Sequence, residues 1–166
     1  FTEEKITKDK LLKILEAGRW APSRINIQPW HFILVDDKKK IKQLISEANY
    51  GDFHEPPSAI IALVLRTKCL TEIRNELKGR DYLLENYMCI AMAGLQMVLE
   101  AHFLGISSSF LTIDGGSKKM LGLSKEDFLP LILALGYEKK WAFQKGRFRK
   151  PLMDIVSHNL LDNNGF

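Results

Sequence analysis

The apolar residues of the first twenty positions recur at the spacing of an amphipathic helix. The stripe they form consists of Leu11, Ile14, Leu15 and Gly18. Thr7 stands where an N-cap is expected, and Ile6 and Leu11 have the spacing of a hydrophobic staple across it. Pro22 disfavours helical backbone in the residue before it. We therefore expect this helix to end near Trp20.

Four short runs have the length of strands, and all but the serine-rich third one are mostly apolar. They are Trp30–Val35, Ala59–Leu65, Ser107–Thr112 and Leu129–Gly136. The second run reads AIIALVL and holds no polar residue, which is typical of a central strand covered on both faces. Helical patterns lie between the runs, so the chain is expected to form one α/β or α+β domain over residues 1–166.

Three further helices are predicted between these strands. Asp36 or Asp37 would cap one whose apolar positions are Ile41, Leu44, Ile45 and Ala48. A polar helical segment follows the second strand. The turn Asp114–Gly116 leads into a short helix at Ser117–Leu121, and the last thirty residues show no period and are expected to form an extended arm.

A long helix is predicted over Tyr82–Leu104, with Gly105 ending it. Its apolar residues lie on most sides of the helix: Tyr87, Ile90, Ala91, Ala93, Gly94, Leu95, Met97, Val98 and Ala101. A helix that is apolar all round is buried, and in a domain of this size we expect a partner chain to supply part of the cover. The small residues Ala91, Ala93 and Gly94 would permit close helix–helix approach.

Composition and charge exclude several function classes. The 166 residues are 46% hydrophobic and 27% charged, and a net charge of +4 comes from scattered cations without interleaved aromatics. This argues against a nucleic-acid platform. Cys69 and Cys89 have no second pair, so neither a disulfide framework nor a zinc knuckle is indicated, and reducing cytoplasm is expected. No membrane-spanning run or signal peptide is indicated.

The common catalytic motifs are absent from the sequence. The four histidines show no metal-ligand spacing, and none of GxSxG, GxxxxGK[ST] or GxGxxG occurs. No side-chain nucleophile or metal site is therefore assigned. If the chain is an enzyme, we expect a cofactor to carry the chemistry.

Two segments have the chemistry of a cofactor site. In Pro22–Trp30, Asn26 and Gln28 can donate and accept hydrogen bonds at once, as a heteroaromatic ring edge requires. Ser23 and Arg24 in the same segment suit a phosphate or a ribityl chain. In RFRKPL, Arg147 and Arg149 would lie on one side of an extended chain, able to clamp one phosphate. A polar surface loop and a solvated basic tail are the alternatives.

The stretch LLKILEAGRWAPSRINIQPWHFILV resembles the signature of the nitroreductase family of flavin enzymes. There a helix ends in A-P-S and is followed by x-x-N-x-Q-P-W and a strand, as in Ala21–Ser23, Asn26 and Gln28–Trp30. Three later segments agree in order with the family pattern: Glu100–Gly105, then Met120–Leu123 with Leu131–Tyr137, and Arg147–Leu152. The resemblance covers nearly the whole chain.

The resemblance implies a three-layer α/β/α sandwich of the α+β class, with a mixed or antiparallel sheet. It also implies a homodimer that holds one FMN at each of two subunit-interface sites. FMN would take hydride from NADH or NADPH and pass it to a nitroaromatic, a quinone or a similar small acceptor. The chemistry would take place on FMN, so no catalytic side chain is assigned.

The resemblance also assigns binding roles. The residues expected to reach the flavin held mainly by the other subunit are Pro22, Ser23, Arg24 and Asn26. Arg147 and Arg149 are expected to hold the FMN phosphate. The turn that contains Thr112 and Ile113 would bring a backbone N–H toward flavin N5, and Asn49 is a further candidate at the flavin edge. Gln28 and Trp30 are expected to be structural.

One part of the family pattern has no counterpart in the numbered chain. The family begins with R-R-S-x-R-x-F, whose basic residues also grip FMN, and this chain begins at Phe1, where the F would stand. Those residues are either absent or precede residue 1. Their absence would weaken FMN binding, because two or three charge-assisted hydrogen bonds of roughly 1.5–3 kcal/mol each would be missing.

Two other interpretations remain open from the sequence. One is a flavoprotein of the same fold with different chemistry, such as dehalogenation or flavin breakdown. The other is a non-catalytic basic interaction module without a cofactor.

Overall fold

A four-stranded antiparallel sheet forms the centre of the computed structural model, which describes residues 1–49, 51, 53–66, 82–113, 117–140 and 148–159. Its strands are β1 (Trp30–Val35), β2 (Ala59–Leu65), β3 (Ser107–Leu111) and β4 (Phe128–Gly136). They lie in the order β1-β2-β4-β3, so β1 and β3 are the two edges. All four predicted strands are confirmed to within one residue at their ends.

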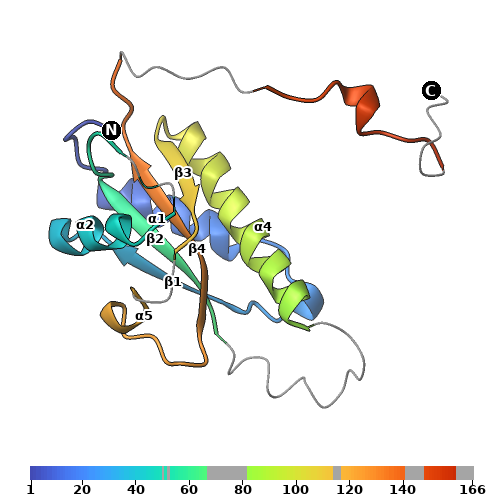
Figure 1. Ribbon diagram of the computed structural model, residues 1–166, viewed down its shortest axis with the longest axis horizontal. Coiled ribbons are helices and arrows are strands. Elements are labelled where there is room, and N and C mark those ends of the chain that lie inside the picture. The colour runs from blue at the N-terminus through green and yellow to red at the C-terminus, as the bar shows by residue number, and fades with distance from the viewer. Residues whose placement is uncertain (50, 52, 67–81, 114–116, 141–147, 160–166) are drawn as a thin grey trace.

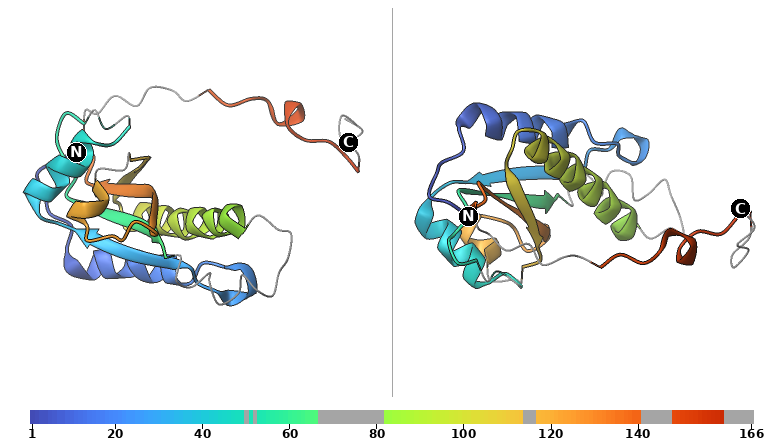
Figure 2. Two further views of the ribbon diagram at one scale, coloured as in Figure 1. Left: turned by 60° about the horizontal axis from the view of Figure 1, so that its bottom comes forward. Right: turned by 90° about the horizontal axis from the view of Figure 1, so that it is seen from above.

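Every residue of β2 is buried, which confirms the prediction of a central strand covered on both faces. Ile61, Leu63 and Leu65 pack into one apolar cluster, and Ile60, Ala62 and Val64 pack into the other. This alternation follows from the two-residue period of a strand. Helices α1 and α4 cover the first face, and α2 and α5 cover the second, as Figure 2 shows. The fold is the expected three-layer α+β sandwich.

Helix α1 (Lys8–Arg19) begins after Thr7, as predicted. Ile6 and Leu11 are both buried in the same cluster, in agreement with the predicted staple. The Thr7 side chain, however, makes no capping hydrogen bond. The prediction was therefore right about where the helix begins and wrong about the bond that caps it.

Helix α2 (Lys38–Ser46) is capped by Asp37, whose Oδ1 accepts hydrogen bonds from the backbone N–H groups of Lys39 and Lys40 at 3.0 and 2.9 Å. Ala48, predicted as a helical position, lies beyond the helix and forms an isolated antiparallel bridge with Ile113. Helix α5 (Ser117–Met120) is a single turn that packs beside α2.

Helix α4 (Tyr82–Phe103) ends in a Schellman motif, as its glycine predicts. Gly105 has φ +73°, and the backbone N–H groups of Gly105 and Ile106 donate to the carbonyls of His102 and Ala101. Gly94 does not serve helix–helix approach. A Cβ there would lie 2.9 Å from the Phe110 ring and 3.1 Å from Leu63, so this glycine lets the helix approach the sheet.

The opposite face of α4 is exposed. An apolar stripe runs along it at intervals of three and four residues, formed by Leu84, Met88, Met92, Leu95, Leu99 and Phe103. The helix is therefore apolar on both faces but covered by this chain on only one. We call this set of residues the α4 stripe.

The segment 148–159 extends away from the layered body, as Figures 1 and 2 show, and carries a short 3₁₀ turn, η2 (Leu152–Asp154). The predicted polar helical segment after β2, the turn Asp114–Gly116, Cys69 and Arg147 lie outside the described residues. Cys89 is buried in the core, as expected. None of the helices in the described part of the chain has the length and hydropathy needed to cross a bilayer.

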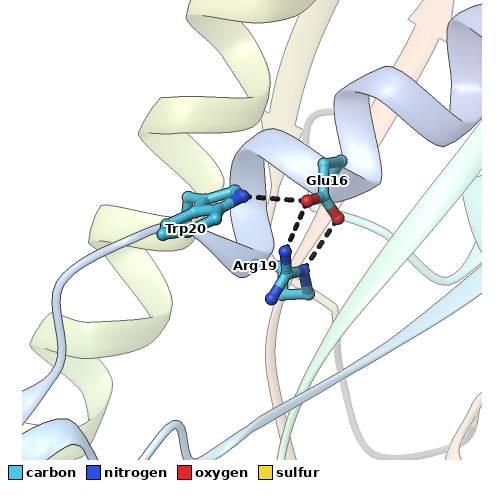
Figure 3. Close-up of polar contacts among 3 residues, drawn as sticks. All are labelled: Glu16, Arg19 and Trp20. Atoms are coloured by element: carbon cyan, nitrogen blue, oxygen red, sulfur yellow. Dashed lines mark hydrogen bonds and ion pairs between the residues drawn. The ribbon is translucent and has the colours of Figure 1, made fainter.

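A compact ionic group marks the end of α1 (Figure 3). Glu16 accepts hydrogen bonds from the Arg19 guanidinium at 2.8 and 2.5 Å and from Trp20 Nε1 at 2.8 Å. The Arg19 guanidinium also lies 4.9 Å from the centroid of the Trp20 ring. The hydrogen bonds from Arg19, and then that from Trp20, lower the pKa of Glu16 from 4.5 to about 2. All three groups are exposed, so solvent screening keeps their effect on stability small.

This group predicts how Trp20 responds to acid. Since the pKa of Glu16 is lowered by folding, its contacts are intact at and above pH 4.5 and are lost as pH falls through about 2. The indole N–H resonance of Trp20 should therefore shift with a midpoint near pH 2 in an NMR titration. Glu16→Gln should remove the step, and a wild-type midpoint near 4.5 would contradict the assignment.

Candidate functional site

The connection between α1 and β1 contains a strained turn. It includes a short 3₁₀ segment, η1 (Arg24–Asn26), and three non-glycine residues with positive φ: Ile25 at 44°, Asn26 at 59° and Gln28 at 50°. Such angles are uncommon, and for β-branched Ile25 they are a clear outlier. Each costs on the order of 1–3 kcal/mol and persists only where neighbouring contacts impose it.

Hydrogen bonds within the loop hold part of this shape. Ser23 Oγ accepts the backbone N–H of Gln28 at 3.0 Å, and Gln28 Nε2 donates to the carbonyl of Asn26 at 3.2 Å. Gln28 thus fixes the loop, as expected. Trp30 also has its expected structural role, since it packs on the α1 and α4 side of the sheet with its ring stacked on Phe32.

The side chains of the turn point in different directions: some are exposed, and one polar side chain points inward. Pro22 and Asn26 are exposed, and within the described residues the Asn26 side-chain amide has no hydrogen-bond partner. Arg24 points instead to the start of α4, where its Nε lies 2.7 Å from Oε2 of Glu85. The side chains of Arg24 and Glu85 are only 19% and 29% exposed.

A second group of predicted residues meets where α2 ends. The backbone N–H of Asn49 donates to the carbonyl of Thr112 at 2.9 Å, and Asn49 Nδ2 donates to Thr112 Oγ1 at 3.2 Å. Nearby, the buried Ser117 hydroxyl donates to the Glu47 carboxylate in a short hydrogen bond. The structure therefore joins Asn49 to the Thr112–Ile113 turn, which the sequence separates by more than sixty positions.

Arg149 lies on the extended segment 148–159. It is exposed, and its Nη1 donates to the neighbouring carbonyl of Phe148 at 3.0 Å. Its guanidinium therefore remains accessible to an anion. The paired position, Arg147, is outside the described residues.

The chain does not gather all these groups at one place. The Pro22–Gln28 loop precedes β1, whereas the Thr112–Ile113 turn follows β3, and these strands are opposite edges of the sheet. At about 4.8 Å between neighbouring strands, three steps separate the two edges by roughly 14 Å. Within one chain, the two groups therefore lie apart, as two candidate half-sites.

The donor set suits FMN and does not suit a metal. Among the described residues no cluster of three His, Cys, Asp or Glu side chains could hold a metal ion. The unpartnered Asn26 amide can both donate and accept, as the edge of the flavin ring requires, and the exposed guanidinium of Arg149 suits a phosphate. The residues present thus fit the cofactor that the sequence indicates.

Sequence reasoning missed Glu85, Glu47 and Ser117. Glu85 lies in the first turn of α4, where an acidic residue is usual because of the helix dipole. Glu47 and Ser117 lie in different helical segments and form their contact only after folding. No sequence signal distinguishes these residues from ordinary surface positions.

Comparison with known proteins agrees with the resemblance. The model of the nitroreductase family matches residues 1–57. A protein of Archaeoglobus fulgidus that carries the name NADH dehydrogenase/NAD(P)H nitroreductase is 29% identical over 145 residues, which cover 84% of this chain and 78% of that protein. Iodotyrosine deiodinase of Daphnia pulex is 26% identical over 182 residues, and the chain spans 61% of its length.

Solved structures show the same fold. An FMN-dependent nitroreductase of Clostridium difficile R20291 superimposes with a TM-score of 0.76 at 22% identity, and the match covers 96% of this chain and 92% of that one. The family model, the named relatives and the shared fold agree with the A-P-S…N-x-Q-P-W loop observed between α1 and β1. The family model, the named relatives and the fold together support the nitroreductase family as the family that this chain resembles.

Proposed function

We propose that this chain, an FMN-dependent oxidoreductase, uses its bound FMN to take hydride from NAD(P)H and pass it to a nitroaromatic, a quinone or a similar small acceptor in ping-pong order. The observation that carries the proposal is the strained Pro22–Gln28 loop, which holds the family motif and exposes an unpartnered amide at Asn26. This proposal replaces the alternative of a non-catalytic basic interaction module, which the charge pattern by itself had left open.

Asn26 and Ser23 are proposed to bind the edge of the ring system. The Asn26 amide offers one donor and one acceptor side by side, so it can pair with adjacent N–H and C=O groups. The Ser23 oxygen already accepts the N–H of Gln28, which leaves its hydroxyl hydrogen available as a donor. Pro22 restricts the backbone before them and Arg24 anchors the same loop through Glu85.

The Thr112–Ile113 turn is proposed to present a backbone N–H to flavin N5. Asn49 holds this turn by its main chain and by its side chain, so the direction of the turn is set by two hydrogen bonds. A donor fixed in advance stabilises developing negative charge without reorganisation. Asn49 is also a candidate contact at the flavin edge.

Arg147 and Arg149 are proposed to bind the phosphate of FMN. Arg149 is exposed and lies on a segment that extends away from its own body, as Figure 1 shows. A guanidinium binds a phosphate through two parallel charge-assisted hydrogen bonds.

A homodimer is proposed to bring the separate half-sites together. The α4 stripe exposes Leu84, Met88, Leu95 and Leu99 by more than half each, and such a continuous apolar surface marks an interaction site. The extended segment carries further exposed apolar side chains at Phe148, Leu152 and Ile155. A second copy that covers these surfaces would place its own half-site beside this one.

A second candidate function is reductive dehalogenation. It is supported by the similarity to iodotyrosine deiodinases of Daphnia pulex and Thermotoga neapolitana, at 26% and 28% identity. The two functions differ in the acceptor, because one reduces a nitro or quinone group and the other breaks a carbon–halogen bond.

Steady-state kinetics test the proposed function. The purified protein should be yellow and oxidise NADH or NADPH with menadione or a nitrofuran, giving parallel lines in double-reciprocal plots. Iodotyrosine supplied in place of the quinone should give slower turnover. Intersecting lines would contradict the ping-pong order, and turnover with iodotyrosine alone would favour the second candidate.

Replacing Arg149 tests the phosphate role. Arg149→Ala should weaken FMN binding about tenfold to a hundredfold, since one charge-assisted hydrogen bond contributes roughly 1.5–3 kcal/mol. Flavin fluorescence measures the affinity. Lys150→Ala, at the neighbouring exposed position, is the control and should bind FMN nearly as wild type does. Equal FMN retention by both variants would refute the assignment.

The dimer predicts a selective effect of charge on the α4 stripe. Leu95→Glu should shift the protein toward monomer in sedimentation velocity at micromolar concentration, because it places a carboxylate in a proposed apolar interface. Leu12→Glu is the matched control: Leu12 is similarly exposed, at 50% against 53%, but lies on α1. A monomeric wild type would be inconsistent with a shared site.

A further inference from the structure

The ion pair between Arg24 and Glu85 joins the strained loop to α4. Arg24 Nε lies 2.7 Å from Glu85 Oε2, and both side chains are mostly buried. A half-buried ion pair is screened less by solvent and salt than a surface pair, and removing one partner leaves the other charge poorly solvated. The pair is therefore a firm link between two elements that are far apart in sequence.

The ion pair lies next to the strained residues of the loop. Arg24 immediately precedes Ile25 and Asn26, whose backbones are held at φ 44° and 59°. The hydrogen bonds from Gln28 to Ser23 and Asn26 close the loop on itself, but they do not set its direction relative to the body. A contact to a rigid helix supplies that direction, since strained residues persist where several contacts impose them.

The same link connects the loop to the proposed interface. Glu85 is adjacent to Leu84 and one turn from Met88, two members of the α4 stripe. Helix α4 would contact the partner through this stripe, and Glu85 would hold the loop against the same helix. The ion pair would thereby fix the position of the loop relative to the surface on which the partner is proposed to dock.

We infer that Glu85 is a positioning residue for the FMN-binding loop: by holding Arg24 against α4, it fixes the left-handed turn that presents the Asn26 amide. This inference rests on the proposed function. It assigns the Arg24 guanidinium to anchoring the loop, and it adds a residue, Glu85, that the family motif does not include.

The competing role for Glu85 is stabilisation of α4 alone. An acidic residue in the first turn of a helix interacts favourably with the helix dipole. In that case, neutralising Glu85 would loosen the start of α4 and leave the loop unaffected. The positioning role therefore predicts a change in the loop, whereas the helix-stabilising role predicts a change at the start of α4.

Hydrogen exchange on the flavin-free full chain separates them. Glu85→Gln should accelerate exchange of the backbone amides of Asn26, Ile27 and Gln28 about tenfold, since a coupling near 1.4 kcal/mol corresponds to that factor. Exchange within the middle of α4 should stay at wild-type rates. Glu100→Gln, at another partly buried glutamate of the same helix, should change neither region.

A double-mutant cycle gives a second measurement and a second variant. Arg24→Gln should accelerate exchange in the loop as Glu85→Gln does, and the double variant should be no worse than either single one. Arg24→Lys, which keeps the charge, should restore part of the protection. In parallel, Glu85→Gln should lower FMN affinity about fivefold to tenfold, and Glu100→Gln should not.

The outcomes distinguish this inference from the proposed function. Unchanged loop exchange in Glu85→Gln and Arg24→Gln, or acceleration confined to α4, would overturn the positioning role. Faster loop exchange with unchanged FMN affinity would also overturn it, because the loop would then be held without effect on the cofactor. Failure of wild type to bind FMN would refute the proposed function and the cofactor part of this inference together.

Discussion

Burial of β2 on both faces is the constraint on which the rest of the structure depends. Its seven residues are all apolar and all buried, and their side chains alternate between the two faces of the sheet. A strand of this kind needs cover above and below, because every exposed face would leave large aliphatic side chains in water. Helices α1 and α4 supply one cover and α2 with α5 the other. The three layers are the direct consequence.

Helix α4 helps to cover one face of the sheet and leaves a second apolar surface exposed on its opposite side. Ile90, Met97 and Ala101 are buried in the cluster that α4 forms with α1 and the sheet, whereas Leu95 and Leu99 on the opposite side are more than half exposed. One helix cannot bury two faces against a single sheet. The helix that covers β2 with one face therefore presents, on its other face, the surface on which the proposed dimer is built, and fold and assembly are linked through one element.

The candidate site combines a strained backbone with few side-chain contacts. The loop before β1 holds three non-glycine residues at positive φ, and its contacts within the loop and to Glu85 keep them there. The side-chain amide of Asn26 is among the groups that remain exposed. Strain maintained in this way would keep the proposed binding group in position before a ligand arrives, which would reduce the entropy lost on binding. The loop that holds the strained backbone is therefore also the loop that is proposed to bind the cofactor.

The sequence by itself determined the elements of this protein, and only the tertiary structure decided their partners. A continuous apolar run placed β2 correctly and helical patterns placed α1 and α4, because such patterns depend on neighbours a few positions apart. The A-P-S…N-x-Q-P-W motif likewise located the loop. The Arg24–Glu85 pair, the bonds between Asn49 and Thr112, and the contact of Gly94 with Phe110 could not be predicted, since each joins residues whose approach depends on how layers pack. Local patterns specify which face is apolar, but the partner of each side chain is set by the geometry of the whole fold.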